Sequence, residues 1–313
     1  MKVLSIDGGG IRGLIPALVL AEVERRTRRP TAELFDLVAG TSTGGILACA
    51  LTRPGADGGP AFSAEELSEV YLTEGPEIFN RSLLKRVLSV EGFLDERYED
   101  DGLEAALERY LDDARLSGAL CDLLVTAYDI KDRFAFFFRS ARARSDPTYD
   151  FSLRDVARAT AAAPTYFEPV EVTDTAGART YPLIDGGVFA NNPALCAYTD
   201  VMAAGGGLDV LASLGTGSQT RSYDVAAVRR WGQVQWARPV LDMVFDGVSD
   251  TIDFELGALA ADRYVRLQVE LRYARDDLDD ASEGNLRRLR GEGERLIAER
   301  TADIEALCER LTS

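Results

Sequence analysis

The chain has 313 residues, of which 46% are hydrophobic and 28% are charged, a balance typical of a soluble globular protein. This length suits one large domain or at most two smaller ones, and it suffices to bury a sizeable core without metal ions or disulfide bonds. The formal net charge of −17 argues against general binding to nucleic acids, because phosphate groups would be repelled, and it disfavours broad adsorption to anionic membranes.

The first predicted elements are a strand, a glycine turn and a helix. Residues 2–7 are predicted to form a short buried strand, and apolar residues at helical spacing predict a helix over about 14–28. Between them lies the turn Gly8-Gly9-Gly10-Ile11-Arg12-Gly13. Its backbone N–H groups can converge on one anion, because glycine has no Cβ to block the approach, and such a turn suits an oxyanion hole.

Two alternatives remain open at this turn. It also matches Gly-x-Gly-x-x-Gly, the fingerprint of a dinucleotide-binding protein, but the second strand ends in Ala39 and Gly40 where that fingerprint needs an acidic residue. Arg12 is expected either to support the loop, to attract an anionic headgroup, or to form a structural salt bridge such as one to Asp7.

A second strand, turn and helix follow at once. The apolar run 34–39 predicts a strand, Gly40-Thr41-Ser42-Thr43-Gly44 follows, and a helix is predicted to run on toward Pro54. Gly-x-Ser-x-Gly between a strand and a helix is the pattern of a nucleophile elbow, which exposes a serine hydroxyl, although an inert serine in a tight turn would look the same. Two strand–turn–helix units in succession predict parallel strands with crossover helices.

Further elements are predicted along the rest of the chain. Ser63 and Glu66 form a capping box for a helix that follows the loop 53–60. Strands are predicted at 123–130, 134–138, 181–184 and 209–214, and from about residue 223 the chain is predicted to be mainly helical, ending in an amphipathic helix over 285–311.

Asp185 is the third candidate for chemistry. It ends a predicted strand and is followed by Gly186 and Gly187. A serine nucleophile needs a base, and the chain contains no histidine. An aspartate has an ordinary pKa of about 3.9, but burial beside apolar groups raises that value, so Asp185 could accept the proton of Ser42. The alternative is a plain Asp-Gly turn, since sequence separation alone does not bring the two residues together.

The positions of the cysteines and the absence of histidine indicate whether the protein binds a metal and in which cellular compartment it is found. Cys49, Cys121, Cys196 and Cys308 are far apart and have no metal-ligand spacing, and the chain has no histidine to complete a site, so we expect free thiols and no zinc. Residues 2–6 are too short for a signal peptide and no run approaches a membrane span. The sequence therefore predicts a cytoplasmic protein, with peripheral contact to a membrane left open.

The three elements together resemble the patatin-like lipid acyl hydrolases. That family combines an Asp-Gly-Gly-Gly-x-Arg/Lys-Gly loop, a Gly-x-Ser-x-Gly elbow and a later Asp-Gly-Gly/Ala, which stand here at residues 7–13, 40–44 and 185–187. Supporting stretches that also resemble the family are residues 161–167, 189–193 and 213–217. The resemblance covers about residues 1–220.

The resemblance implies an α/β fold of three α/β/α layers with a mostly parallel sheet. It implies a catalytic core over 1–220. Beyond that core, the helical pattern of the residues predicts a mainly helical extension over 221–313, packed on the same domain. The resemblance assigns Ser42 as nucleophile and Asp185 as general base, working through an acyl-enzyme without a metal or other cofactor. Gly8, Gly9 and Gly10 of the first loop would form the oxyanion hole. The residues that would support the site are Arg12, Gly40, Gly44, Gly186 and Gly187.

The resemblance also implies hydrolysis of fatty-acyl esters of phospholipids, lysophospholipids or galactolipids at a membrane or micelle surface. The apolar series 78–94, which contains Arg81, Lys85 and Arg86, is expected to border the acyl pocket or touch lipid, with ordinary core packing as the alternative. Acyl transfer with the same two residues, a nucleotide-binding protein and an inactive lipid-binding module remain alternatives. A small-molecule activator is conceivable, no nucleic-acid polymer is expected as a partner, and the oligomeric state is not indicated.

Overall fold

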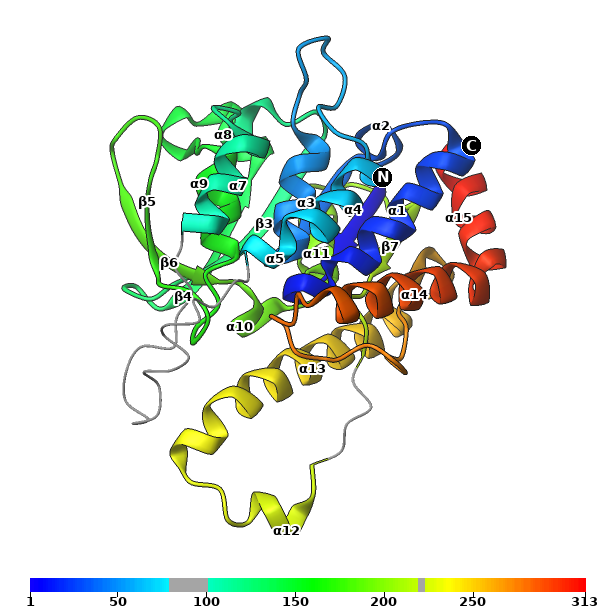
Figure 1. Ribbon diagram of the computed structural model, residues 1–313. Helices are drawn as coiled ribbons and strands as arrows, with labels where there is room; N and C mark the ends of the chain where they lie inside the picture. Colours follow the sequence, from blue (N-terminus) through cyan, green and yellow to red (C-terminus); the bar gives the residue numbers. More distant parts are fainter. Residues whose placement is uncertain (79–100, 219–222) are drawn as a thin grey trace.

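The computed structural model describes residues 1–78, 101–218 and 223–313, whose strands form a single sheet (Figure 1). Its order is β5-β6-β3-β2-β1-β7-β8, and β4 pairs with β3. The strands are β1 (Lys2–Ile6), β2 (Leu37–Gly40), β3 (Asp122–Asp129), β4 (Phe134–Arg139), β5 (Val170–Thr173), β6 (Thr180–Asp185), β7 (Val210–Leu214) and β8 (Tyr264–Leu267). The central run β3-β2-β1-β7-β8 is parallel, whereas β4, β5 and β6 pair antiparallel.

Helices cover both faces of this sheet. They are α1 (Leu14–Thr27), α2 (Thr31–Leu34), α3 (Thr43–Thr52), α4 (Ala64–Thr73), α5 (Gly75–Ile78), α7 (Asp101–Leu111), α8 (Ser140–Ser145), α9 (Leu153–Thr160), α10 (Gly187–Ala190), α11 (Ala194–Ala203), α12 (Val225–Val228), α13 (Gln233–Leu259), α14 (Glu283–Glu299) and α15 (Thr301–Thr312). A short 3-10 helix, η1 (Gly10–Gly13), connects β1 to α1.

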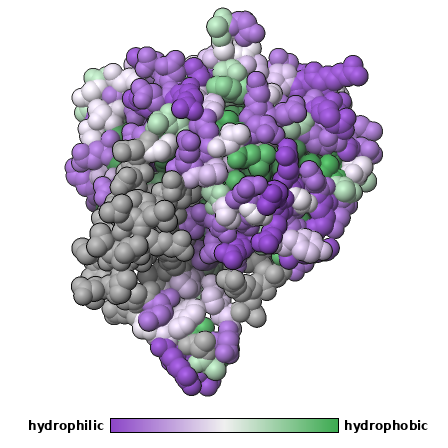
Figure 2. Space-filling model, viewed as in Figure 1, coloured by the Kyte–Doolittle hydropathy of each residue, from purple (hydrophilic) through white to green (hydrophobic). Residues whose placement is uncertain are grey.

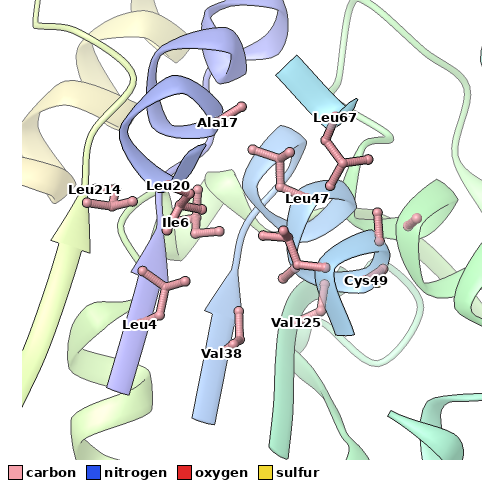
Figure 3. Close-up of a cluster of buried hydrophobic side chains, with 14 of the residues drawn as sticks. Leu4, Ile6, Ala17, Leu20, Val38, Leu47, Cys49, Leu67, Val125 and Leu214 are labelled. Atoms are coloured by element: carbon pink, nitrogen blue, oxygen red, sulfur yellow. The ribbon is translucent and has the colours of Figure 1, made fainter. Parts of the chain in front are cut away.

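Two hydrophobic cores lie on opposite faces of the sheet. Side chains alternate along a strand, so Leu4 and Ile6 of β1 pack under α1, α3 and α4, as Figure 3 shows. Val3 belongs to the other core, together with residues of α11 and α13 such as Ala197 and Leu256. The fold is therefore a three-layer α/β/α arrangement around a mostly parallel sheet, as predicted.

Several elements differ from the predicted ones, and the edge strand β5 is not among the predicted strands. The helix α2 ends at Leu34, so the second strand begins only at Leu37. The predicted closing helix is divided at Arg300 into α14 and α15. The strand β8 falls in a region predicted to be mainly helical, and it pairs in parallel with β7. At four residues it is too short for an alternating pattern to mark it.

The C-terminal residues return to the N-terminal helix. Figure 1 shows α14 and α15 beside α1, and a Cβ placed at Gly293 of α14 would lie 2.7 Å from Leu18 of α1. The division of the chain into a catalytic core over 1–220 and a helical extension over 221–313 stays a prediction.

The visible surface is mainly polar. In Figure 2 the described part of this face is largely hydrophilic, in keeping with the net charge of −17. None of the helices in the described ranges has both the length and the apolar composition needed to cross a membrane.

Candidate active site

Ser42 occupies the turn between β2 and α3 in an unusual backbone conformation. Its φ is 54° and its ψ is −125°, which an L-residue adopts only when its surroundings enforce it. The Ser42 N–H donates to Thr160 Oγ1 over 2.8 Å. A Cβ at Gly40 would lie 2.2 Å from the Gly44 carbonyl oxygen, and one at Gly44 would lie 2.2 Å from that of Ile6. The elbow therefore needs glycine on both sides of the serine.

Asp185 lies at the end of β6 and meets Ser42. The side chain is 2% exposed, and its carboxylate accepts hydrogen bonds from the Ser42 hydroxyl and, over 2.7 Å, from the Gly187 N–H. Burial raises the pKa of Asp185 to about 7, against the lowering effect of these two hydrogen bonds. A Cβ at Gly186 would lie 2.2 Å from Thr126 Oγ1, so glycine is needed for β6 to approach β3 here.

The first glycine loop lies beside this pair. Gly9 and Gly10 line the same cavity as Ser42 and Asp185, and within the described ranges neither of their N–H groups has an acceptor. The Gly8 N–H, in contrast, donates to the Asn191 carbonyl over 3.0 Å. The Gly8 N–H is therefore already engaged within the fold, whereas those of Gly9 and Gly10 are left open to a ligand by the described residues; that Gly8 takes part in the oxyanion hole stays a prediction.

Arg12 does not pair with Asp7. Asp7 is bound instead by Arg266 of β8, whose Nη2 lies 2.6 Å from Asp7 Oδ2. The buried Arg12 guanidinium donates from Nε to the Gly9 carbonyl over 3.3 Å and from Nη1 to the Gly217 carbonyl over 3.4 Å. Of the roles considered for Arg12, the structure shows support of the loop.

The cavity beside Ser42 is strongly apolar. Side chains from α3, α4, α7 and the segment after α9 line it, among them Ile46, Leu47, Leu67, Leu103, Leu107 and Phe167. Ile78 also lines it, whereas the remainder of the apolar series 79–94 lies outside the described residues. This lining is suited to a hydrocarbon chain rather than to a polar ligand.

Sequence reasoning missed three contributors to the site. Asn191 and Thr216 lie in the stretches 189–193 and 213–217, whose pattern predicts no role for these two side chains. In the structure they hold the backbone of Gly8 on its two sides. Thr160 holds the Ser42 N–H and carried no signal of its own, because a threonine at a helix end is common. Within the described ranges no group of three or more His, Cys, Asp or Glu side chains is arranged to hold a metal ion.

A serine on a strained strand-to-helix turn, at the edge of a parallel α/β sheet and facing an apolar cavity, is typical of serine-dependent acyl hydrolases. The comparisons with known proteins agree. The family model for patatin-like phospholipases matches residues 4–198. The chain belongs to this family, and that membership supports a lipid acyl hydrolase activity.

Relatives extend the similarity beyond the matched segment. Patatin-like protein 2 of Arabidopsis thaliana is 34% identical over 97% of this chain and 84% of its own length. Patatin-like protein 1 of Oryza sativa subsp. indica is 32% identical over 97% of this chain and 83% of its own. The solved structure of VipD from Legionella pneumophila covers 95% of this chain and 67% of its own at 11% identity, with a TM-score of 0.39, which is too low to support a conclusion about the fold.

Proposed function

We propose that the protein is a serine acyl hydrolase that cleaves fatty-acyl esters of lipids, with Ser42 as nucleophile and Asp185 as general base. The observation that carries this proposal is the hydrogen bond between the Ser42 hydroxyl and the buried Asp185 carboxylate, whose pKa is raised to about 7. A base with a pKa near the working pH takes up and returns a proton readily. No imidazole is needed for that exchange.

The reaction would proceed through two tetrahedral intermediates. Ser42 Oγ attacks the ester carbonyl carbon while its proton passes to Asp185, and the carbonyl electrons move onto oxygen. As the intermediate collapses, the C–O bond to the alcohol breaks and Asp185 returns the proton to the leaving oxygen. Water then attacks the acyl-enzyme, Asp185 takes one of its protons, and that proton returns to Ser42 as the fatty acid leaves.

The negative oxygen of each intermediate would be stabilised by the glycine loop. Gly9 and Gly10 border the cavity that holds Ser42, and their N–H groups have no acceptor in the described part of the chain. A well-placed donor of this kind contributes about 3–4 kcal/mol to the stability of the transition state. The N-terminus of α3, which begins at Thr43, adds a positive dipole end close to Ser42.

The acyl chain would occupy the apolar cavity. Leu47 of α3, Leu67 of α4 and Leu107 of α7 surround a space that opens at Ser42, so a chain lying among them would place its ester at the nucleophile. Long-chain substrates reside in membranes or micelles, and we propose that the protein meets them there transiently. The description of the matching family model, patatin-like phospholipase, supports phospholipids as the substrates, cleaved at an acyl ester as a phospholipase A cleaves them.

The test compares two substitutions with matched controls. Ser42→Ala removes the nucleophile and Asp185→Asn removes the base while keeping the shape of the side chain. We expect each to reduce hydrolysis of a short-chain aryl ester and of phospholipid vesicles by at least about a thousandfold. The exposed residues Ser145 and Asp132 provide the controls Ser145→Ala and Asp132→Asn, which should keep wild-type activity.

Both active-site variants should fold normally, as judged by circular dichroism and thermal unfolding. Substantial turnover in folded Ser42→Ala would refute the nucleophile assignment. Adding an alcohol acceptor to the assay would show whether the wild-type protein also transfers the acyl group to acceptors other than water, since the same acyl-enzyme serves both reactions.

A further inference from the structure

The turn Gly215-Thr216-Gly217, which follows β7, packs against the glycine loop. Thr216 is 3% exposed and its hydroxyl donates to the Gly8 carbonyl over 2.8 Å. A Cβ at Gly9 would lie 2.2 Å from Thr216 Oγ1, so this side chain packs against the Gly8–Gly9 peptide. Gly9 borders the cavity of Ser42, whereas Thr216 is not among the residues that line it.

The hydrogen bond from Thr216 has a geometric consequence for Gly9. In a trans peptide the C=O of one residue and the N–H of the next point in opposite directions. A Gly8 carbonyl held toward Thr216 therefore directs the Gly9 N–H away from Thr216. The next peptide is held in the same way, because the Arg12 N–H and Nε donate to the Gly9 carbonyl over 3.1 Å and 3.3 Å and so direct the Gly10 N–H.

The turn that carries Thr216 is itself anchored. The Gly217 N–H donates to Gln268 Oε1 over 2.8 Å, and the Gly215 N–H donates to the Leu267 carbonyl over 2.9 Å. Gly217 has a φ of 96°, a conformation that favours glycine. These contacts tie the turn to the end of β8, so the orientation of the glycine loop depends on a strand far along the chain.

Such an anchor matters because the loop contains three glycines in succession. Glycine peptides rotate among many conformations, so an unanchored loop would present its N–H groups in several directions. Donors stabilise an oxyanion well only when they are already aimed before the charge develops, because their reorientation then costs nothing during the reaction.

We propose that Thr216 is a positioning residue for the oxyanion hole: its hydroxyl fixes the Gly8–Gly9 peptide so that the Gly9 N–H faces the developing oxyanion. This inference rests on the proposed function, since it requires that Gly9 bind the oxyanion. It assigns a role to Thr216, which is not among the residues that line the cavity.

The test is a pair of variants that differ by one oxygen atom. Thr216→Ser keeps the hydroxyl and Thr216→Ala loses it, while both lose the same methyl group. With a short-chain aryl ester, we expect the alanine variant to have a kcat about 10- to 100-fold below that of the serine variant, with an unchanged KM. The inhibition constant of a trifluoromethyl ketone, which forms a tetrahedral oxyanion adduct, should rise by the same factor.

If Thr216 had a purely structural role, its loss would lower thermal stability without lowering kcat and inhibitor affinity by the same factor. The unfolding temperatures of the two variants are therefore measured together with the kinetic constants. Equal kcat values for the two variants would overturn the inference. If Thr216→Ala does not fold, two variants of Gln268, which anchors the turn that carries Thr216, are compared instead. Gln268→Glu keeps an acceptor for the Gly217 N–H and Gln268→Met does not. Equal kcat values for these two variants would also overturn the inference. Turnover by Ser42→Ala would instead refute the proposed function, whereas an inactive Ser42→Ala beside a fully active Thr216→Ala would refute only the role of Thr216.

Discussion

The raised pKa of Asp185 makes a prediction about stability as well as catalysis. The difference between an ordinary aspartate pKa of 3.8 and a pKa of about 7 corresponds to about 4 kcal/mol. The folded state binds the proton of Asp185 more tightly than the unfolded state does. The contribution of this proton to the free energy of unfolding is therefore fully present below about pH 4, and it is lost progressively as the pH rises to and through about 7. Asp185→Asn cannot ionise, so it should be more stable than the wild type at high pH.

The size of that gain can be worked out at two pH values. At pH 8.5 the full difference of about 4 kcal/mol applies, whereas at pH 5.5 only about 2 kcal/mol does, since 5.5 lies about halfway between the two pKa values. Asn keeps an oxygen that can accept from the Gly187 N–H, so this hydrogen bond is retained in the variant.

The assay is urea unfolding of the wild type and Asp185→Asn at both pH values. We expect the variant to exceed the wild type in free energy of unfolding at both, by about 2 kcal/mol more at pH 8.5 than at pH 5.5. Asp132→Asn, at an exposed site, should show no such dependence. An Asp185→Asn effect that is the same at both pH values would refute the reasoning, because it would mean that Asp185 has an ordinary pKa in the folded protein.

Two further predictions concern activity. The profile of kcat/KM against pH should have an acid limb with an apparent pKa of about 7, since Asp185 must be ionised to accept a proton, and a chelator should leave the profile unchanged; a limb that disappears with the chelator would point to a metal. Gly10→Ala should lower kcat at least about tenfold, because Gly10 has a φ of 56° and a Cβ there would lie 2.1 Å from the Leu278 carbonyl oxygen. The control Gly58→Ala has a φ of 85° with open space around it, so it should be active; equal activity of the two would contradict the role given to the loop.

Much of the fold followed from local patterns. The two strand–turn–helix units before residue 54 each combine a short apolar run, a glycine turn and helical spacing, and they predicted the parallel centre of the sheet correctly. The strand β8 could not be predicted, because its four residues form a strand only through pairing with β7. Such pairing depends on the packing of the whole domain.

The candidate site, like the fold, could be predicted from the sequence only in part. Glycine and serine spacing identified the elbow around Ser42 and the turn after Asp185, since those residue types are required by the backbone itself. Partners far along the chain were not visible: nothing local indicates that Arg266 binds Asp7 or that Asn191 engages the Gly8 N–H. Whether a glycine N–H is available for an oxyanion is decided by such long-range contacts.

The central claim is that Ser42 carries the acyl group during turnover. Rapid acid quenching of the wild-type protein with an aryl ester, followed by peptide mass spectrometry, tests it most directly. The account predicts that the mass of the acyl group is added to Ser42, and that this addition is absent in Ser42→Ala and strongly reduced in Asp185→Asn. An acyl group found on another residue, or one that persists in Ser42→Ala, would contradict it.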